Sequence, residues 1–204
     1  MKDFLLRQTA IGLVKEVIAK EEKCLLFPIG SCMTPLICHK DRVIAQRTAV
    51  DDIHLGDIIL YQVSSDRLFI HRNIHKTVDD GQVILFTKAD NLLFAEPPIT
   101  ADRILAKITA VEKSFRTIRL DTKLSRFLNR WLARYSYAIH ILSFQLRSLK
   151  RALFSNKKSP LFNLAQKALQ KVSSSLAKFL VNLMFLAQKE MRQEGSNNRK
   201  REEA

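Results

Sequence analysis

The sequence predicts an α+β protein in which an N-terminal helix precedes a curled, mainly antiparallel β-sheet and a basic helical hairpin follows it. Apolar residues recur at helical spacing before residue 25 and after residue 120, whereas short β-rich segments alternate with turn signals between them. Charge divides the chain at the same place: residues 1–121 hold 17 Lys and Arg against 16 Asp and Glu, and residues 122–204 hold 17 against 4. The 204 residues, 47% of them hydrophobic, suffice for one core with an appended module.

The first two predicted units are an amphipathic helix over residues 1–24 and a β domain over residues 25–121. The helix carries apolar residues at helical spacing with charges between them: Phe4, Ile11, Val14 and Ile18. In the β domain, turn signals such as DDGQ and EPPIT separate six segments that are rich in branched and aromatic residues. These predicted strands are RVIAQR, DIILYQV, RLFIHRNIH, QVILFTK, ILAKITAV and FRTIRL.

The last two predicted units are a basic amphipathic helical hairpin over residues 122–192 and a disordered tail over residues 193–204. Apolar residues from Leu124 to Leu149 recur mostly at steps of three and four, which predicts one long helix. The stretch SNKKSP ends it, with Ser159 as N-cap and Pro160 in the first turn of a second helix.

Several classes of protein are disfavoured by composition. Three cysteines without a C-x-x-C pair suggest neither a disulfide framework nor a common zinc site, so we expect a reducing setting and no metal or cofactor. The N-terminus carries charges throughout and lacks the apolar core of a signal peptide. No stretch reaches the roughly 18 uncharged apolar residues of a membrane span, so we expect a chain that does not cross a bilayer and, with the reducing setting, a cytoplasmic protein.

Five segments along residues 4–121 together resemble the signal peptidase I superfamily. They are GSCMTPLI, LGDIILY, FIHR, FTKADN leading to EPP, and ILAKITAVEK, and they follow one another in the order and spacing of that family. The subgroup they resemble uses histidine in place of the catalytic lysine, and the small bacterial relatives found beside peptide-export or peptide-modification genes are closer still. The resemblance implies a signal peptidase/LexA-like β domain.

The resemblance also implies the catalytic residues. The family's nucleophilic serine directly precedes the methionine of G-x-S-M-x-P, so Cys32 occupies that position and Ser31 the neighbouring variable one. The histidine of the family's His-Arg pair maps onto His71, the general base. Its supporting acids map onto Asp90, which would orient the base, and onto Glu96.

Substrate-binding positions follow from the same motif. Gly30, Met33 and Pro35 match it, and in the family the apolar surface beside them grips an extended substrate as an added strand. The chain departs from the family pattern elsewhere: besides the serine, glycines are replaced by Lys40 and Ala89. These changes imply altered turns near the site.

A Cys32/His71 dyad makes chemical sense without the family. An imidazole can take the proton of a neighbouring thiol and return it to the leaving amine, and a cationic histidine lowers the pKa of a thiol below its usual value of about 8.5. A carboxylate such as Asp90 can fix the tautomer of that imidazole. Taken alone, however, Cys32 is typical of a buried small apolar residue.

Two functions from different classes therefore remain open. The first is an endopeptidase that cleaves the leader or pro-segment of an exported or modified peptide. The second is a non-catalytic peptide-binding module on the same fold. An autocleaving repressor of the same superfamily is disfavoured, because no lysine matches its base and the N-terminal segment is too short for a DNA-binding domain.

The hairpin has three interpretations. Residues 122–189 hold 13 Lys and Arg and no acid, so the helices can pack on the sheet, lie on anionic lipid or bind nucleic acid. Packing accounts for part of the pattern. We favour additional peripheral contact with the inner face of the cell membrane, and no specific nucleic acid is expected because no binding motif is present.

Overall fold

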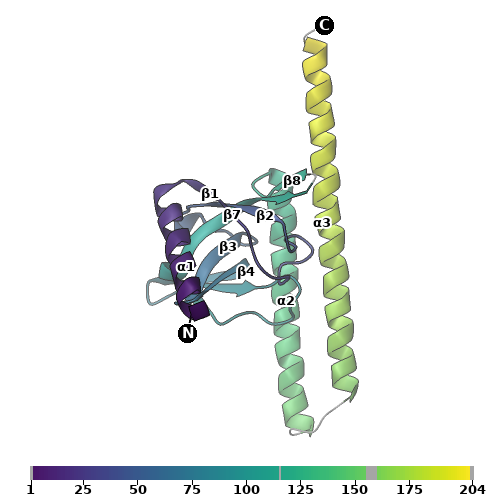
Figure 1. The fold of residues 1–204 in the computed structure, drawn as a ribbon. Helices are drawn as coiled ribbons and strands as arrows, with labels where there is room; N and C mark the ends of the chain where they lie inside the picture. The colour runs from purple at the N-terminus through teal and green to yellow at the C-terminus, as the bar shows by residue number, and fades with distance from the viewer. Residues whose placement is uncertain (1, 115, 155–159, 203–204) are drawn as a thin grey trace.

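The computed structural model describes residues 2–114, 116–154 and 160–202, and it confirms an α+β fold with one N-terminal helix, an eight-stranded antiparallel sheet and two C-terminal helices (Figure 1). Helix α1 (Lys2–Lys20) leads into the sheet, and α2 (Lys123–Phe154) and α3 (Pro160–Glu202) follow it. The strands are β1 (Lys23–Leu26), β2 (Arg42–Gln46), β3 (Ile58–Ser64), β4 (Arg67–Asp79), β5 (Gln82–Lys88), β6 (Ile99–Thr100), β7 (Ile104–Lys113) and β8 (Arg116–Arg119). Two single-turn helices, η1 (Val50–Asp52) and η2 (Ala101–Arg103), lie between strands.

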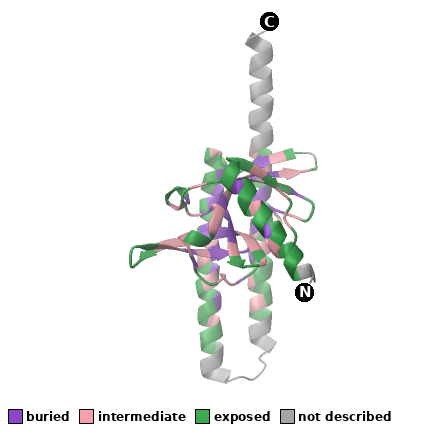
Figure 2. Ribbon diagram, turned by 60° about the vertical axis from the view of Figure 1, so that its left-hand side comes forward, coloured by how far each residue is buried: buried purple, intermediate pink, exposed green. Residues whose placement is uncertain are grey.

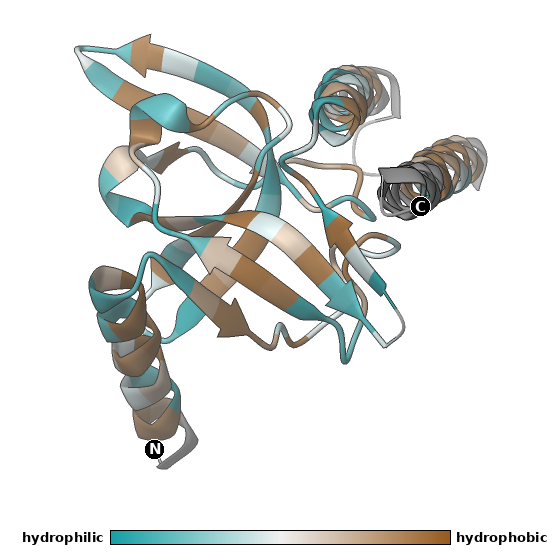
Figure 3. Ribbon diagram, turned by 90° about the horizontal axis from the view of Figure 1, so that it is seen from above, coloured by the Kyte–Doolittle hydropathy of each residue, from teal (hydrophilic) through white to brown (hydrophobic). Residues whose placement is uncertain are grey.

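The sheet follows the order β1-β2-β7-β3-β4-β5-β6, with β8 paired to β7. Register shifts interrupt the pairing at several places, among them the step from Ile44 to Ala45 in β2 and the step from Asn73 to His75 in β4. Such bulges increase local twist, and the sheet curls around its apolar face (Figure 3). Long β4 pairs with β3 through its first half and with β5 through its second half.

Each of the six predicted strands is present, and branched or aromatic residues in them are buried, on one face in β2 and on both faces in β3. The sequence missed β1 and β6, which have four and two residues and so carry little pattern. In α1, Ile11 and Ile18 are buried as predicted, whereas Phe4 is exposed.

The tail is a further difference, because α3 continues to Glu202 where the sequence predicts disorder from residue 193. No proline follows Pro160, and extending an existing helix costs far less than starting one.

The hairpin shares its core with the sheet. Leu128 and Leu132 of α2 and Leu180 and Met184 of α3 are buried in one cluster with residues of β2, β3 and β7. Exposed residues instead cover the sides of both helices that point away from the sheet (Figure 2). The approach of α2 is close enough to require Gly56, whose φ is +93° and where a Cβ would lie 2.5 Å from the backbone of Asn129.

Across the described residues, none of the helices combines the length and the apolar character needed to cross a bilayer.

Candidate active site

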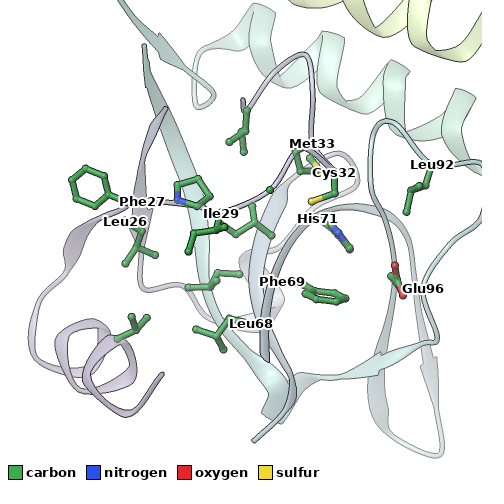
Figure 4. A pocket seen from close by; sticks show the side chains of 16 residues that line it. Leu26, Phe27, Ile29, Cys32, Met33, Leu68, Phe69, His71, Leu92 and Glu96 are labelled. Carbon is green, nitrogen blue, oxygen red and sulfur yellow. The ribbon is translucent and has the colours of Figure 1, made fainter. Parts of the chain in front are cut away.

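A cavity of about 490 Å³ opens between the segment that follows β1 and the first half of β4 (Figure 4). Leu26 to Gly30 line one side of it and Leu68 to His71 the other. Most of the wall is apolar, and α1 contributes Val14. The polar groups gather at one end, where the lining residues are Cys32, His71 and Glu96. This pocket therefore brings together two residues that are far apart in the sequence and that the resemblance pairs as nucleophile and base.

The loop that follows Gly30 directs Cys32 into the pocket. Gly30 has a φ of +119°, a conformation that side-chain-bearing residues rarely adopt, so the turn into the loop requires glycine. Met33, only 2% exposed, anchors the loop in the core. The backbone N–H of Asn91 donates to the carbonyl of Cys32 at 3.2 Å, and its side-chain amide donates to the carbonyl of Ser31 at 2.7 Å. Cys32 thus lines the pocket, while Ser31 is exposed outside its wall.

His71 is held by a chain of buried hydroxyl groups. It lies opposite Ile59 on β3, which places it diagonally across from Tyr61 on the same face of the sheet. The hydroxyl of Tyr61 lies 3.0 Å from Nδ1 of His71, and Thr87 of β5 donates a hydrogen bond to that hydroxyl at 2.9 Å. Since Nδ1 is engaged, Nε2 is the ring nitrogen left for chemistry in the pocket.

Burial controls the charge state of His71. The pKa of the imidazole is lowered to about 4, mainly by desolvation; the charge of Asp90 opposes this shift and the charge of Lys88 adds to it. At neutral pH the imidazole is therefore uncharged, which is the form in which it can accept a proton.

Cys32 is also uncharged at neutral pH. Burial raises the pKa of its thiol above the ordinary value, and the carboxylates of Asp90 and Glu96 add to this. The backbone N–H groups of Cys32 and Met33 lower the pKa but do not outweigh the burial. The sequence-based expectation that a cationic His71 acidifies the thiol is wrong, because the buried histidine carries no charge.

Asp90 binds Arg72 rather than His71. Nε and Nη2 of Arg72 each donate to one carboxylate oxygen of Asp90 at 2.8 Å, and both side chains are almost fully buried. Nη1 of Arg72 donates to the carbonyl of Gly56 at 3.0 Å and to Oδ1 of Asn129 at 2.8 Å. The sequence predicts that Asp90 orients the base, but the hydrogen bond at Nδ1 comes from Tyr61. Asp90 instead ties the segment before Asn91 to β4 and α2, and it acts on His71 and Cys32 through its charge.

The remaining predicted residues divide between the pocket and its surroundings. Gly30, Met33 and Glu96 line the pocket, with the carboxylate of Glu96 facing its polar end (Figure 4). Pro35 is not among the lining residues, and its carbonyl accepts a hydrogen bond from the thiol of Cys38 at 3.5 Å. Pro35 therefore shapes the loop rather than contacting a ligand in this cavity.

The sequence did not single out Tyr61, Thr87 or Asn91, which position the two central residues. Tyr61 looked like one more aromatic strand residue, and Thr87 like one more β-branched one. Tyr61 lies two residues from Ile59, the strand partner of His71, and its hydroxyl is on the buried face of β3. This placement would have indicated a contact with His71, but it depends on the strand register, which one sequence does not give.

The geometry permits nucleophilic chemistry. The pocket places a thiol and a neutral imidazole at its polar end, with the N–H groups of Cys32 and Met33 directed at the sulfur, where they can stabilise an oxyanion. Among the described residues, no hydrogen bond joins the thiol to the imidazole. For metal chemistry, no group of three His, Cys, Asp or Glu side chains within the described ranges is placed to hold an ion.

Comparison with known proteins yields no match, whether with family models, curated proteins or solved structures. The family resemblance therefore depends on the motifs and on the site that they form.

Proposed function

We propose that this protein is an endopeptidase of the signal peptidase type, which cleaves the leader or pro-segment of an exported or modified peptide with a Cys32/His71 dyad. The observation that carries the proposal is that both residues line one pocket, with Nδ1 of His71 held by Tyr61. Five motifs in register on an antiparallel sheet support the family assignment.

The shape of the pocket suits an extended peptide. In the first half of β4, Leu68 to Ile70 pair with β3 on one edge, and β5 joins the other edge only from Arg72 onward. The free edge of β4 faces the segment that follows β1, so a substrate strand can lie between them and pair with exposed backbone groups. Its apolar side chains would contact Ile29, Leu60 and Phe69.

The chemical steps use two uncharged groups. The sulfur of Cys32 attacks the scissile carbonyl carbon, its proton passes to Nε2 of His71, and the carbonyl electron pair moves onto oxygen near the N–H groups of Cys32 and Met33. When the C–N bond breaks, Nε2 returns the proton to the leaving amine. Water then hydrolyses the thioester, giving a proton to His71 that is returned to the thiol.

The direction of the hydroxyl chain matters for this mechanism. When Thr87 donates to Tyr61 and Tyr61 donates to Nδ1, the proton of the neutral imidazole is on Nε2, which is the acid form. Rotation of the two hydroxyl groups lets Nδ1–H donate to Tyr61 instead, and Nε2 becomes the base.

The second candidate is a non-catalytic module that binds the same peptide. It is favoured by the raised pKa of Cys32 together with the lowered pKa of His71, because neither supplies a resting thiolate. In this case the groove is retained and the chemistry is lost.

Peptide cleavage distinguishes the two. Fluorogenic peptides from an apolar-rich library are incubated with the protein, and acid-quenched samples are analysed by mass spectrometry for a thioester on Cys32. The endopeptidase predicts cleavage and a thioester, with loss of both in Cys32→Ala and a drop of about 100-fold or more in His71→Ala. Cys24→Ala is the matched control, since Cys24 is also a partly buried free cysteine but lies outside the pocket.

Other outcomes contradict the peptidase. Peptides that bind saturably but remain intact indicate the binding module. Cleavage that persists in Cys32→Ala refutes the assigned nucleophile.

A further inference from the structure

The helical hairpin carries a second apolar surface, on the side that faces away from the β domain. On α2, exposed apolar residues recur at steps of three, four and seven, and they include Phe127, Trp131 and Leu142. On α3, the corresponding exposed residues include Val172, Phe179 and Leu186. Each helix is therefore apolar on its inner face and also along part of its outer face. Packing on the core of the protein requires only the inner apolar face.

Contacts to the β domain fix the inner side of each helix. On α2, Asn129 binds Arg72, the ring of His140 accepts the N–H of Ala95 at 3.0 Å, and Arg147 lies over the ring of Phe94 at 3.8 Å. On α3, Gln170 donates to the carbonyl of Asn91 at 3.4 Å, and Phe185 packs against Arg116 at 4.0 Å.

The residues that pack the two helices against each other lie next to these contacts. Leu128, Leu132 and Tyr135 of α2 pack in one cluster with Leu176 and Leu180 of α3, and Tyr135 lies against Ser173. At 3.6 residues per turn, the exposed apolar residues of each helix lie beside the residues that pack against the other helix. They lie on the opposite side of the helix from the residues that contact the β domain. Because the helices are antiparallel neighbours (Figure 1), both exposed rows belong to one continuous surface, which we call the outer apolar strip.

Basic residues border the outer apolar strip along both margins. Arg126, Arg130 and Arg134 recur every four residues beside the strip on α2. Lys167, Lys171 and Lys178 form the corresponding row on α3. All six side chains are exposed, and residues 122–189 contain no acid that could pair with them along the hairpin.

We propose that the outer apolar strip docks the protein flat on a membrane that contains anionic lipid. Apolar and aromatic side chains bordered on both sides by Lys and Arg are typical of helices that lie in the interface plane, with the apolar face at the acyl boundary and the cations at the phosphates. Trp131 and its stacked neighbour Tyr135, whose ring centroids are 6.0 Å apart, suit the interface because their rings are amphipathic.

Charge selects this occupant over the alternatives. A second copy of the chain packed strip against strip would bring rows of arginine and lysine together without any acid between them. Nucleic acid would use the basic rows but would leave the apolar strip exposed to water. An anionic lipid surface satisfies both features at once.

The docked orientation keeps the candidate active site accessible. Helix α1, which contributes Val14 to the pocket, lies across the sheet from the hairpin (Figures 1 and 3). Lipid binding and peptide cleavage therefore use different surfaces and can fail independently.

The experiment uses Trp131, which is the single tryptophan of the chain, as a reporter placed within the strip. The full-length protein is mixed with phosphatidylcholine vesicles that do or do not contain phosphatidylglycerol. Binding is measured by flotation, and burial of Trp131 by its emission maximum and by quenching with bromine-labelled lipid. We expect flotation, a blue shift and quenching with the anionic vesicles, and binding at least about 10-fold weaker without phosphatidylglycerol.

Two variants with matched exposure locate the contact. Phe127→Gln/Phe179→Gln removes rings that are 63% and 57% exposed and should weaken binding about 10-fold or more. Val78→Gln is the control, since Val78 is 63% exposed but lies on β4, outside the hairpin. Circular dichroism and thermal unfolding verify that each variant is folded.

Three results would overturn the proposal. One is vesicle binding without any change in Trp131 emission or quenching. Another is equal loss of binding in the Val78 control and the double variant. The third is a stable dimer in lipid-free sedimentation that the double variant abolishes, which would assign the strip to self-association.

Discussion

The hydroxyl of Tyr61 lies 3.0 Å from Nδ1 of His71, and both side chains are buried within the sheet. This contact fixes the plane of the imidazole and leaves Nε2 for the pocket. Burial also raises the pKa of Tyr61 well above its usual value, so its hydroxyl keeps its proton throughout the physiological range. A neutral phenol thus occupies the position that a carboxylate takes in many histidine-containing triads.

Tyr61→Phe should therefore lower the cleavage rate by about 10-fold to 100-fold, because Nδ1 loses the hydrogen-bond partner that holds the ring and lets Nε2 alternate between acid and base. The change also leaves Nδ1 of His71 and the hydroxyl of Thr87 unpaired, at a cost of about 1–3 kcal/mol in stability. Steady-state kinetics and chemical unfolding measure the two effects. Tyr137→Phe, on α2 and outside the pocket, is the control and should leave cleavage unchanged.

The depressed pKa of His71 makes stability depend on pH. The folded imidazole titrates at about 4 and the unfolded one near 6.5, so between these values the unfolded state binds more protons. The free energy of unfolding should be unaffected by this group above pH 6.5 and should fall by about 3 kcal/mol as the pH drops toward 4.

Urea unfolding of the parent protein and of His71→Gln, measured between pH 4 and 6.5, isolates the contribution of His71 to the free energy of unfolding. The variant should lose that part of the pH dependence. Identical slopes in both proteins would show that His71 titrates normally when folded.

Features that depend on residues close together in the sequence can be predicted from it, whereas contacts between distant segments cannot. Alternation in QVILFTK predicts β5 over its observed bounds, and helical spacing predicts α2, because both signals are local. The motif around Cys32 locates the pocket for a similar reason, since Gly30 and Met33 act on the loop that contains them. The partners of His71 are not local, because the contact with Tyr61 depends on strand register.

Long-range pairing also explains why the role of Asp90 was misassigned. The family resemblance assigns Asp90 to His71, and Arg72 is in the sequence merely the residue after His71. Adjacent residues of a strand point to opposite faces, so Arg72 faces Asp90 on the side of the sheet that α2 covers, while His71 faces the pocket.

Arg72→Met should destabilise the protein by about 3–5 kcal/mol, because it leaves the carboxylate of Asp90 buried without its partner. The double variant Arg72→Met/Asp90→Leu should be more stable than this single variant, since it removes the second charge as well. Arg42→Met is the control: its ion pair with Glu112 is partly exposed, so its loss should cost about 1 kcal/mol or less. If the single and double variants are equally stable, the carboxylate of Asp90 is not the cause of the destabilisation in Arg72→Met. Denaturant unfolding at pH 7 gives all three values.

Lys88→Met tests whether the charge of Lys88 influences the pKa values of His71 and His140. Lys88 is 1% exposed and donates to the carbonyl of Ala89 at 3.2 Å, and burial lowers the pKa of its ammonium to about 8, so the group is mostly charged at neutral pH. Its charge lowers the pKa of His71 and also that of His140. Replacing it with methionine should therefore raise both pKa values.

The measurement is an NMR titration of the histidine ring protons in the variant and the parent protein. Upward shifts of the pKa values of His71 and His140, with the other three histidines unchanged, would support the coupling. Lys123→Met changes an exposed lysine at the start of α2 and should shift none of them. If the pKa of His71 stays in place when Lys88 is removed, its depression comes from burial alone, and the rate of Cys32 acylation should then be equally indifferent to Lys88.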